Sequence, residues 1–284
     1  MKVDIICPLY NATKYISNLH DSFLMQKNVD LNAVIYVVTN TNDGIENILA
    51  HLSKCRYSFI EQSEFSHSLT REKAIYSSDA DIVALVSQDV VIESDMWLYN
   101  LIKPIVEKEC QATYSRQLCN DSSIEKYTRE YNYPAQERLL NQSAIQEYGL
   151  KAFSLSDVSA AIDRNTFVQL GGYDQKDLII NEDMYYAYKL ITSGYSVKYC
   201  PESELIHFHH YTLQDLFKRY YQVGQFFANN PVIYQTGAVK SGGSLAKYIL
   251  KRALQDRNYG VLLRYIPDMA SRYLGMKFGQ LSVR

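Results

Sequence analysis

Two short acidic segments of the chain have residue types and positions that suit catalysis or metal binding. Ser87-Gln88-Asp89 ends an apolar run, and a carboxylate at the end of a strand could hold Mg²⁺ or Mn²⁺, which prefer oxygen ligands. A solvent-facing aspartate at a strand end is the alternative. Asn181-Glu182-Asp183 opens a predicted helix, where acids are favoured by the helix dipole whatever their function. The functional interpretation is that one of these acids is a base that accepts the proton of an attacking hydroxyl.

Histidines and an arginine provide further candidates. His207 and His209 would share one face of a strand while His210 takes the other, so the first two could approach a metal together or simply pack at a sheet edge. Arg71 lies at the start of a predicted helix, where the free amides favour anions, so it could contact a pyrophosphate. An ordinary surface arginine is the alternative.

The elements that must position these residues begin with alternating strands and helices. The first ninety residues have the pattern of βαβ units and a parallel sheet. We expect strands at Lys2–Cys7, Ala33–Thr39, Tyr57–Gln62 and Asp81–Ser87, and helices at Ala12–Gln26, Gly44–Cys55 and Ser68–Ser78. Ligands of such sheets bind beyond the carboxyl ends of the strands, so Pro8–Asn11, Thr39–Asp43 and Ser87–Asp89 should face one another across a crevice.

The second half of the chain has weaker patterns. The polar, tyrosine-rich stretch from Cys110 to Ser156 predicts loops and helices that lie over the sheet. Beyond it we expect strands at Ser159–Asp163, Val197–Cys200 and Leu205–Phe208, helical segments at Arg164–Leu170 and Glu182–Ser193, a tight bend at Gly171–Asp174, and mostly helix from Leu213 onward.

Charge is distributed unevenly along the 284 residues. The formal net charge of -2 gives no reason to expect a nucleic-acid partner. Residues 238–284, however, carry nine basic and two acidic residues, a net charge of +7. Within this tail, Ser244–Gln255 and Val261–Tyr273 are amphipathic, which is typical of helices in the interface of anionic membranes. The alternative is that their apolar stripes pack on the catalytic domain or on a second subunit.

The cysteines and the apolar segments bear on location. Five scattered cysteines without a Cys-x-x-Cys pair suggest neither a disulfide framework nor a zinc site, and favour a reducing compartment. The N-terminus has no signal-peptide core, and no apolar run reaches the roughly 18 residues that span a bilayer. We therefore expect membrane contact, if any, to be peripheral.

Together these residues resemble family 2 glycosyltransferases, and more narrowly the bacterial rhamnosyltransferases of O-antigen and capsule assembly. The resemblance covers about residues 3–245, and its order and spacing are more specific than any single motif. Its motifs are Cys7–Asn11, Phe65–Arg71, Ser87-Gln88-Asp89 in the place of an Asp-x-Asp metal motif, Gly171–Asp174, Glu182-Asp183, His207–Thr212 and Phe217–Gly224.

The family resemblance implies a role for each matching residue. Pro8, Tyr10 and Asn11 would line the nucleoside pocket, Arg71 would contact the diphosphate, and Asp183 would be the base. Asp89 would hold Mg²⁺ or Mn²⁺ beside Gln88 of the same motif, with His209 as a further metal or diphosphate ligand. The aspartate that reads the base in other members is missing after the second strand, so Thr39 or Asn40 would take that role.

The resemblance also implies an overall organisation and an activity. It predicts a GT-A α/β fold, with a Rossmann-like mixed sheet in a catalytic domain at residues 1–212 (donor half about 1–90, acceptor half about 91–212) and a helical, basic region at 213–284. The expected reaction is inverting transfer of L-rhamnose from dTDP-rhamnose to a lipid-linked or growing bacterial glycan, on the cytoplasmic face of the plasma membrane, by a peripheral enzyme that could form a homo-oligomer.

Three other functions compete with this one. A sugar-nucleotide pyrophosphorylase would need a glycine-rich phosphate loop near the N-terminus, and Cys7–Asn11 contains no glycine. The same fold with another donor, such as a UDP-hexose, and a non-catalytic module that binds a nucleotide sugar both remain open at the level of sequence.

Overall fold

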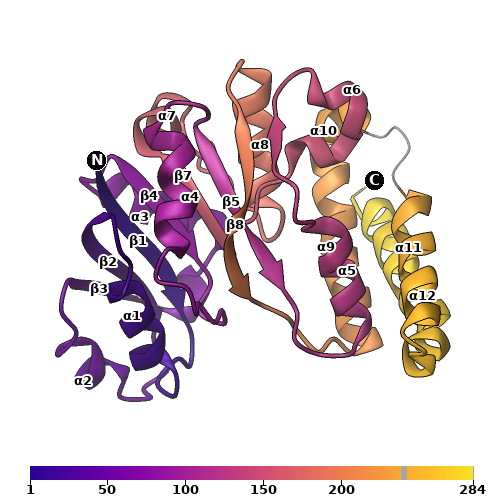
Figure 1. Cartoon of the computed structure of the whole chain (residues 1–284), viewed down its shortest axis with the longest axis horizontal. Coiled ribbons are helices and arrows are strands. Elements are labelled where there is room, and N and C mark those ends of the chain that lie inside the picture. The colour runs from indigo at the N-terminus through magenta and orange to yellow at the C-terminus, as the bar shows by residue number, and fades with distance from the viewer. Residues whose placement is uncertain (238–241, 284) are drawn as a thin grey trace.

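A computed structural model describes residues 1–237 and 242–283 and contains one mixed eight-stranded sheet (Figure 1). The strand order across the sheet is β3-β2-β1-β4-β7-β5-β8-β6. The strands are β1 Lys2–Leu9, β2 Asp30–Thr39, β3 Cys55–Ile60, β4 Ile82–Val86, β5 Ala112–Leu118, β6 Arg138–Leu140, β7 Ser159–Asp163 and β8 Val197–Ile206.

The N-terminal part of the sheet is parallel, as the sequence predicts. β1 pairs in parallel with β2 and β4, and β2 pairs in parallel with β3. The connecting helices are α1 Ile16–Leu24, α2 Ile45–Leu49 and α3 His67–Ser77, of which the first two are shorter than predicted. The carboxyl ends of β1, β2 and β4 therefore lie at one edge of the sheet.

The prediction of loops and helices for residues 110–156 is wrong in part, because this stretch contains helices but also an interior strand. β5 lies between β7 and β8, and β6 forms the sheet edge beyond β8. β5 escapes detection because its polar side chains are buried and satisfied. The Thr113 hydroxyl donates to the carbonyl of Leu101, Ser115 hydrogen-bonds Ser159 and Ser203, and Gln117 donates to Ser156.

The two strands predicted at 197–200 and 205–208 are one strand, β8, which ends at Ile206. Its pairing with β5 shifts register after Cys200, because the chain bulges between Cys200 and Glu204. His207 and Phe208 therefore lie past the end of the strand, in an irregular segment. The alternation of faces predicted from a strand does not apply to them.

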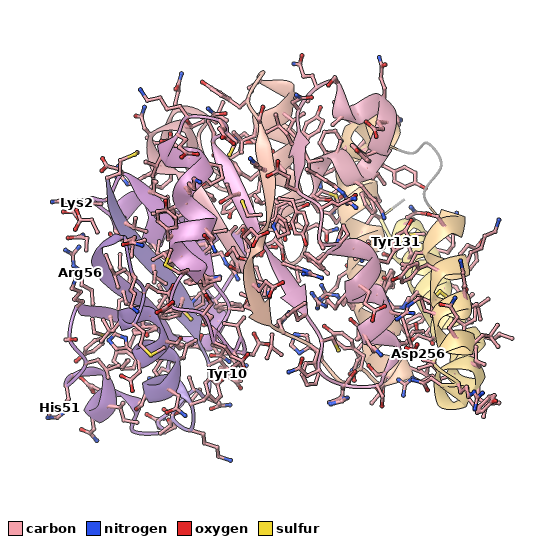
Figure 2. The ribbon with its side chains drawn as sticks, viewed as in Figure 1. Lys2, Tyr10, His51, Arg56, Tyr131 and Asp256 are labelled. Carbon is pink, nitrogen blue, oxygen red and sulfur yellow. The ribbon has the colours of Figure 1, made fainter. Side chains whose placement is uncertain are left out.

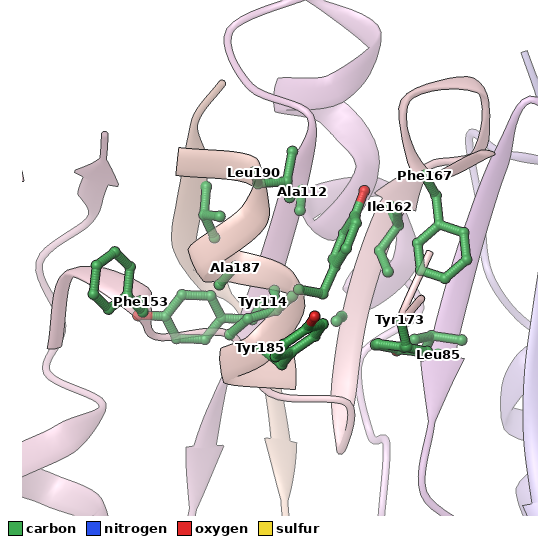
Figure 3. Packing of buried hydrophobic residues seen from close by; sticks show 14 of the residues in the cluster. Leu85, Ala112, Tyr114, Phe153, Ile162, Phe167, Tyr173, Tyr185, Ala187 and Leu190 are labelled. Carbon is green, nitrogen blue, oxygen red and sulfur yellow. The ribbon is translucent and has the colours of Figure 1, made fainter. Parts of the chain in front are cut away.

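Two hydrophobic layers cover the sheet. On one face, side chains of β1, β2 and β4 pack with α1 and with α4 (Trp97–Val106), around Phe23 and Trp97. On the other face, the sheet packs with α3, α7 (Arg164–Gln169) and α8 (Glu182–Thr192). Figure 3 shows this second layer, in which Tyr114 of β5 lies beside Tyr185, Ala187 and Leu190 of α8.

The C-terminal helices stand at the end of the sheet opposite β3 (Figure 1). They are α9 Leu213–Asn229, α10 Pro231–Gly237, α11 Gly242–Gln255 and α12 Tyr259–Leu281. α9 and α12 approach each other closely through glycines. A Cβ on Gly279 would lie 1.9 Å from the carbonyl oxygen of Tyr221, and one on Gly224 would lie 2.2 Å from that of Met276.

α5 (Ile124–Asn132) joins these helices to the sheet domain. Apolar side chains of α11 and α12, including Ile249 and Val261, pack with Ile124 and Tyr127. Polar contacts accompany this core: Tyr131 donates a hydrogen bond to Ser244, and Asp256 pairs with Lys126. Figure 2 labels Tyr131 and Asp256. Within the described residues, no helix combines the length and apolar character needed to cross a membrane. Lys240 and Arg284, counted in the basic tail, lie outside the described residues.

Candidate active site

A cavity of about 450 Å³ lies at the carboxyl ends of β1, β2 and β4. Of the three segments predicted to face the crevice, Pro8, Leu9, Tyr10, Thr39, Ser87, Gln88 and Asp89 line it. The other lining residues are Arg71, Gln62, Phe65 and His67. Its volume falls within the roughly 300–1,000 Å³ of small-molecule sites. The parallel sheet therefore gathers segments far apart in sequence around one cavity.

The amide of Gln88 joins two walls of the cavity. Its Oε1 accepts a hydrogen bond from the Tyr10 backbone N–H at 2.7 Å, and its Nε2 donates to the Tyr10 carbonyl at 2.9 Å. This paired bond fixes the segment after β1 against the segment after β4. In the structure Gln88 thus orders the backbone of the cavity wall.

Arg71 is buried and bound to two carboxylates of the second half of the chain. Its Nη1 lies 3.2 Å from Glu182 Oε1, and its Nε lies 3.7 Å from Asp157 Oδ2. Tyr173 also donates to Asp157 Oδ2 at 3.0 Å. Burial raises the pKa of Asp157 to about 7, against the charge of Arg71, which lowers it. Arg71 therefore links α3 to α8 and borders the cavity at the same time.

Asp183 lies in the first turn of α8, next to the carboxylates that Arg71 holds. Its Oδ1 accepts a hydrogen bond from the Met184 backbone N–H at 2.7 Å. Burial, followed by the negative charges of Glu182 and Asp157, raises the pKa of Asp183 well above its usual value. A carboxylate with a raised pKa is a stronger base, which suits proton abstraction near neutral pH.

Asp89 forms a three-residue cluster with His207 and His209. Its Oδ2 lies 3.5 Å from His207 Nε2 and 3.3 Å from His209 Nε2. One potential ligand atom from each residue lies within 4.8 Å of the others, so a single cation could reach all three. Burial opposes ionisation of Asp89, but the hydrogen bond and charge of His207 and the charge of His209 hold its pKa below the usual value.

The ring of His207 is oriented by Gln117, whose side chain is buried. Gln117 Nε2 donates to Ser156 Oγ at 2.8 Å, and its Oε1 accepts from Arg129 Nη1. The same Oε1 lies 3.2 Å from His207 Nδ1, which must therefore carry hydrogen. With hydrogen on Nδ1, Nε2 of His207 can either donate a proton to the Asp89 carboxylate or offer its lone pair to a cation held between the two groups. The cluster therefore fits a divalent cation.

The structure does not bring every predicted residue to the cavity. Asn11, Asn40 and Asp183 are not among its lining residues, and the Asn40 side chain donates to Glu61 Oε1 at 3.2 Å. His209 contacts Asp89 but lines a different cavity. His210 is outside the cluster around Asp89; it lines that different cavity and lies 3.4 Å from Asp121.

Sequence reasoning missed two groups of residues around the cavity. Gln62 lies just past the carboxyl end of β3, and the rule that gathers strand ends at one edge could have found it. Asp157 and Gln117 have no local signal, because their importance comes only from partners distant in sequence.

Comparison with protein families gives one match over more than half the chain. The sequence model described as "Glycosyl transferase family 2" matches residues 4–171. The O-antigen chain rhamnosyltransferase RfbN of Salmonella typhimurium is 27% identical over 285 residues, covering 99% of this chain and 90% of the relative. The O-antigen chain rhamnosyltransferase WbaN of Salmonella anatum is 29% identical over 282 residues, covering 97% and 88%.

Solved structures with a similar fold have much lower sequence identity. A mannosyltransferase of Pyrobaculum calidifontis, solved in complex with GDP-Man and Mn²⁺, has a TM-score of 0.60 at 16% identity, with 95% of this chain and 86% of that chain covered. TarS of S. aureus has a TM-score of 0.57 at 15% identity, with 89% and 43% covered. These likenesses concern the fold alone.

Proposed function

Because the chain belongs to glycosyl transferase family 2 and has the GT-A fold, we propose that it is an inverting rhamnosyltransferase. Its donor would be dTDP-L-rhamnose, and its acceptor a lipid-linked or growing bacterial surface glycan. The two O-antigen chain rhamnosyltransferases, similar over nearly the whole chain, support this assignment. We assign residues 1–212 to catalysis and 213–284 to a helical extension.

The observation that carries the proposal is the cavity beyond β1, β2 and β4, with a candidate cation cluster at its border. Pro8, Tyr10 and Thr39 would contact the nucleoside, and Asn11 and Asn40 would reach it from the segments that follow them. The diphosphate would then lie towards Asp89 and Arg71, both of which line the cavity. Such a position agrees with the rule that ligands of open parallel sheets bind beyond the strand ends.

The residues of the cluster supply the electrostatic part of the proposed reaction. Asp89, His207 and His209 would hold Mg²⁺ or Mn²⁺, which would neutralise charge on the departing nucleoside diphosphate. The Mn²⁺ in the P. calidifontis mannosyltransferase complex supports a cation in a protein of this fold. Gln117 would keep His207 in the tautomer whose Nε2 is free to bind.

Asp183 would be the base. Its raised pKa lets the carboxylate take the proton of an acceptor hydroxyl as that oxygen attacks the anomeric carbon, while the bond to the diphosphate oxygen breaks. Attack from the side opposite the leaving group inverts the anomeric centre. No covalent sugar–enzyme intermediate is required.

The test is a donor panel with purified protein, comparing dTDP-rhamnose with UDP-hexoses in Mg²⁺ or Mn²⁺. We expect hydrolysis or transfer with dTDP-rhamnose and a loss of orders of magnitude in Asp89→Asn. Full activity with a UDP-hexose and none with dTDP-rhamnose would assign the UDP-hexose as the donor. Binding of nucleotide sugars without any turnover would identify the chain as a binding module.

We also propose peripheral contact of the C-terminal helices with an anionic membrane on its cytoplasmic side. α12 exposes a row of large apolar side chains: Leu263 at 82%, Ile266 at 75%, Tyr273 at 58% and Phe278 at 53%. Exposed Lys247, Lys251, Arg257 and Lys277 accompany them on α11, α12 and the turn between them. Each basic residue near an anionic surface contributes on the order of 1 kcal/mol. The five free cysteines fit a reducing compartment.

Vesicle sedimentation tests this contact. The double variant Leu263→Ser, Ile266→Ser should lose binding to vesicles of anionic lipid at low salt, while Val232→Ser, at an exposed position of α10, should keep it. An intact protein that stays in the supernatant and sediments as a dimer would instead make this face of α12 a contact between two copies.

A further inference from the structure

A second cavity, of about 340 Å³, is separate from the cavity beyond β1, β2 and β4, which we call the donor cavity. The residues before and at the start of α5, the segment 209–211, the start of α9 and the first half of α12 form its walls. His209 lines this cavity and lies 3.3 Å from Asp89, which lines the donor cavity. The two cavities therefore meet at the candidate cation cluster.

The second cavity contains carboxylate oxygens without hydrogen-bond donors. Asp268 is only 1% exposed, and its Oδ1 accepts from Arg272 Nε at 2.5 Å. Among residues 1–237 and 242–283, nothing donates a hydrogen bond to its Oδ2. The buried Oδ2 of Asp121 also lacks a hydrogen bond there, although His210 Nδ1 lies 3.4 Å away. Buried acceptors without donors are costly, so a ligand that fits here brings hydrogen-bond donors.

The charges of the lining disfavour a phosphate or another anion. Asp121, Glu125 and Asp268 outnumber the two arginines of the wall, which also contains His209 and His210. Arg272 binds Asp268 and Glu125 and donates to the Tyr220 hydroxyl, while Arg264 donates to the carbonyl of Tyr211. An anion would therefore face more negative than positive charge in these walls.

A sugar ring matches the remaining chemistry. Its hydroxyl groups donate to the free oxygens of Asp268 and Asp121, and its C–H faces can contact the apolar side chains of Ile124, Leu216 and Val261 in the same walls. The cavity volume lies at the lower end of the roughly 300–1,000 Å³ typical of small-molecule sites.

We infer that this second cavity binds a sugar of the acceptor glycan, with α12 as one wall. The inference rests on the proposed glycosyltransferase function and assigns to the C-terminal extension a role in recognising the acceptor. A sugar in this cavity enters the reaction region from the His209 side, whereas the donor enters from the side of β1 and β4.

Gly260 provides a way to fill the cavity without disturbing the fold. It lines the cavity in the first turn of α12, and an added Cβ would meet only Asn258 Oδ1, at 3.7 Å. Gly260→Leu should therefore reduce the space available to a sugar. Ala270→Leu is a matched control, because it adds a similar side chain at an exposed position of the same helix. Asp268→Asn, which can still accept from Arg272 through Oδ1, tests the free oxygen separately.

The measurement is saturation-transfer NMR of the full chain with the methyl glycosides of rhamnose, mannose, galactose and glucose. We expect wild type and Ala270→Leu to bind at least one glycoside, and Gly260→Leu and Asp268→Asn to bind it at least tenfold more weakly. The Tm should be unchanged in Gly260→Leu and lower in Asp268→Asn, which removes a buried charge opposite Arg272. Binding is therefore compared at a temperature at which circular dichroism shows every variant to be folded.

Glycoside binding that is equal in all variants, or absent from wild type, overturns the inference. Two other results separate a failure of this inference from a failure of the proposed transferase function. Glycoside binding that Gly260→Leu removes, together with no turnover of any nucleotide sugar, would keep the sugar site and reject the transferase. Normal transfer with an acceptor KM unchanged in Gly260→Leu would keep the transferase and reject the sugar site.

Discussion

Replacing Arg71 with methionine removes a positive charge that two buried carboxylates share. The Arg71 side chain is 7% exposed, and those of Glu182 and Asp157 are 9% and 3% exposed. Loss of one member of a buried ion pair costs about 3–5 kcal/mol, because the remaining charge stays out of water. We therefore expect Arg71→Met to lower the free energy of unfolding by about 3–5 kcal/mol near pH 8.

The effect of Arg71→Met should depend on pH. Burial raises the pKa of Asp157 to about 7 in the folded protein, from about 3.9 in an unfolded chain. Between these two pKa values the folded state binds more protons than the unfolded state. The contribution of this carboxyl to the free energy of unfolding therefore falls as the pH rises from about 3.9 to about 7. The charge of Arg71 lowers the folded pKa, so without it the fall continues above pH 7. The stability gap between variant and wild type should be larger at pH 8 than at pH 5.

Urea unfolding followed by circular dichroism at pH 5 and pH 8 measures this gap. Arg56→Met is the matched control, because its pair with Asp79 is exposed on both sides and such pairs contribute less than about 1 kcal/mol. A gap below about 1 kcal/mol at pH 8, or the same gap at both pH values, would refute the reasoning. Unchanged stability with weaker binding of a nucleoside diphosphate would favour the phosphate role that family resemblance assigns to Arg71.

Three further predictions test the site and its support. Asp183→Asn should lower kcat by about 10²–10⁴-fold with donor affinity nearly unchanged, and wild-type turnover would reject Asp183 as the base. Gln117→Leu should weaken Mn²⁺ binding, measured by calorimetry, by about 10–100-fold, whereas exposed Gln146→Leu should not; equal affinities would reject the role of Gln117. Gly279→Ala should lower the free energy of unfolding by about 1–3 kcal/mol because its Cβ meets a backbone oxygen at 1.9 Å, and Gly260→Ala should not; equal stabilities would contradict the close packing of α9 and α12.

The donor side of the site could be predicted from the sequence because its signals are local. β1, β2 and β4 are apolar runs, and one rule on parallel sheets then brings their carboxyl ends together. Pro8, Tyr10, Thr39, Gln88 and Asp89 reach the cavity by that rule alone. Only the polar side chains just outside it, such as Asn40, depend on loop geometry that the rule does not describe.

The middle of the sheet could not be predicted because its signals depend on partners. β5 alternates buried hydroxyl and amide side chains that look solvent-exposed in sequence, and each finds its hydrogen-bond partner on another element. The link from Arg71 to Asp157 and Glu182 likewise joins residues that are 86 and 111 positions apart. A pattern in one segment carries no information on such pairs.

The apolar side chains of α12 lie on two sides of the helix, and the two sides have different surroundings. From the sequence, the apolar side chains of 244–255 and 261–273 could contact either a membrane or a protein surface. One helix can contact a protein surface on one side and a second surface on another. Leu262 and Tyr265 pack with the cluster around α5, while Leu263 and Ile266, one position later in each case, are 82% and 75% exposed. A 100° step per residue separates these neighbours, so the inner side holds α12 on the sheet domain and forms the second cavity. The outer side remains free for a second surface, and the variants Leu263→Ser and Ile266→Ser address that side without altering the inner one.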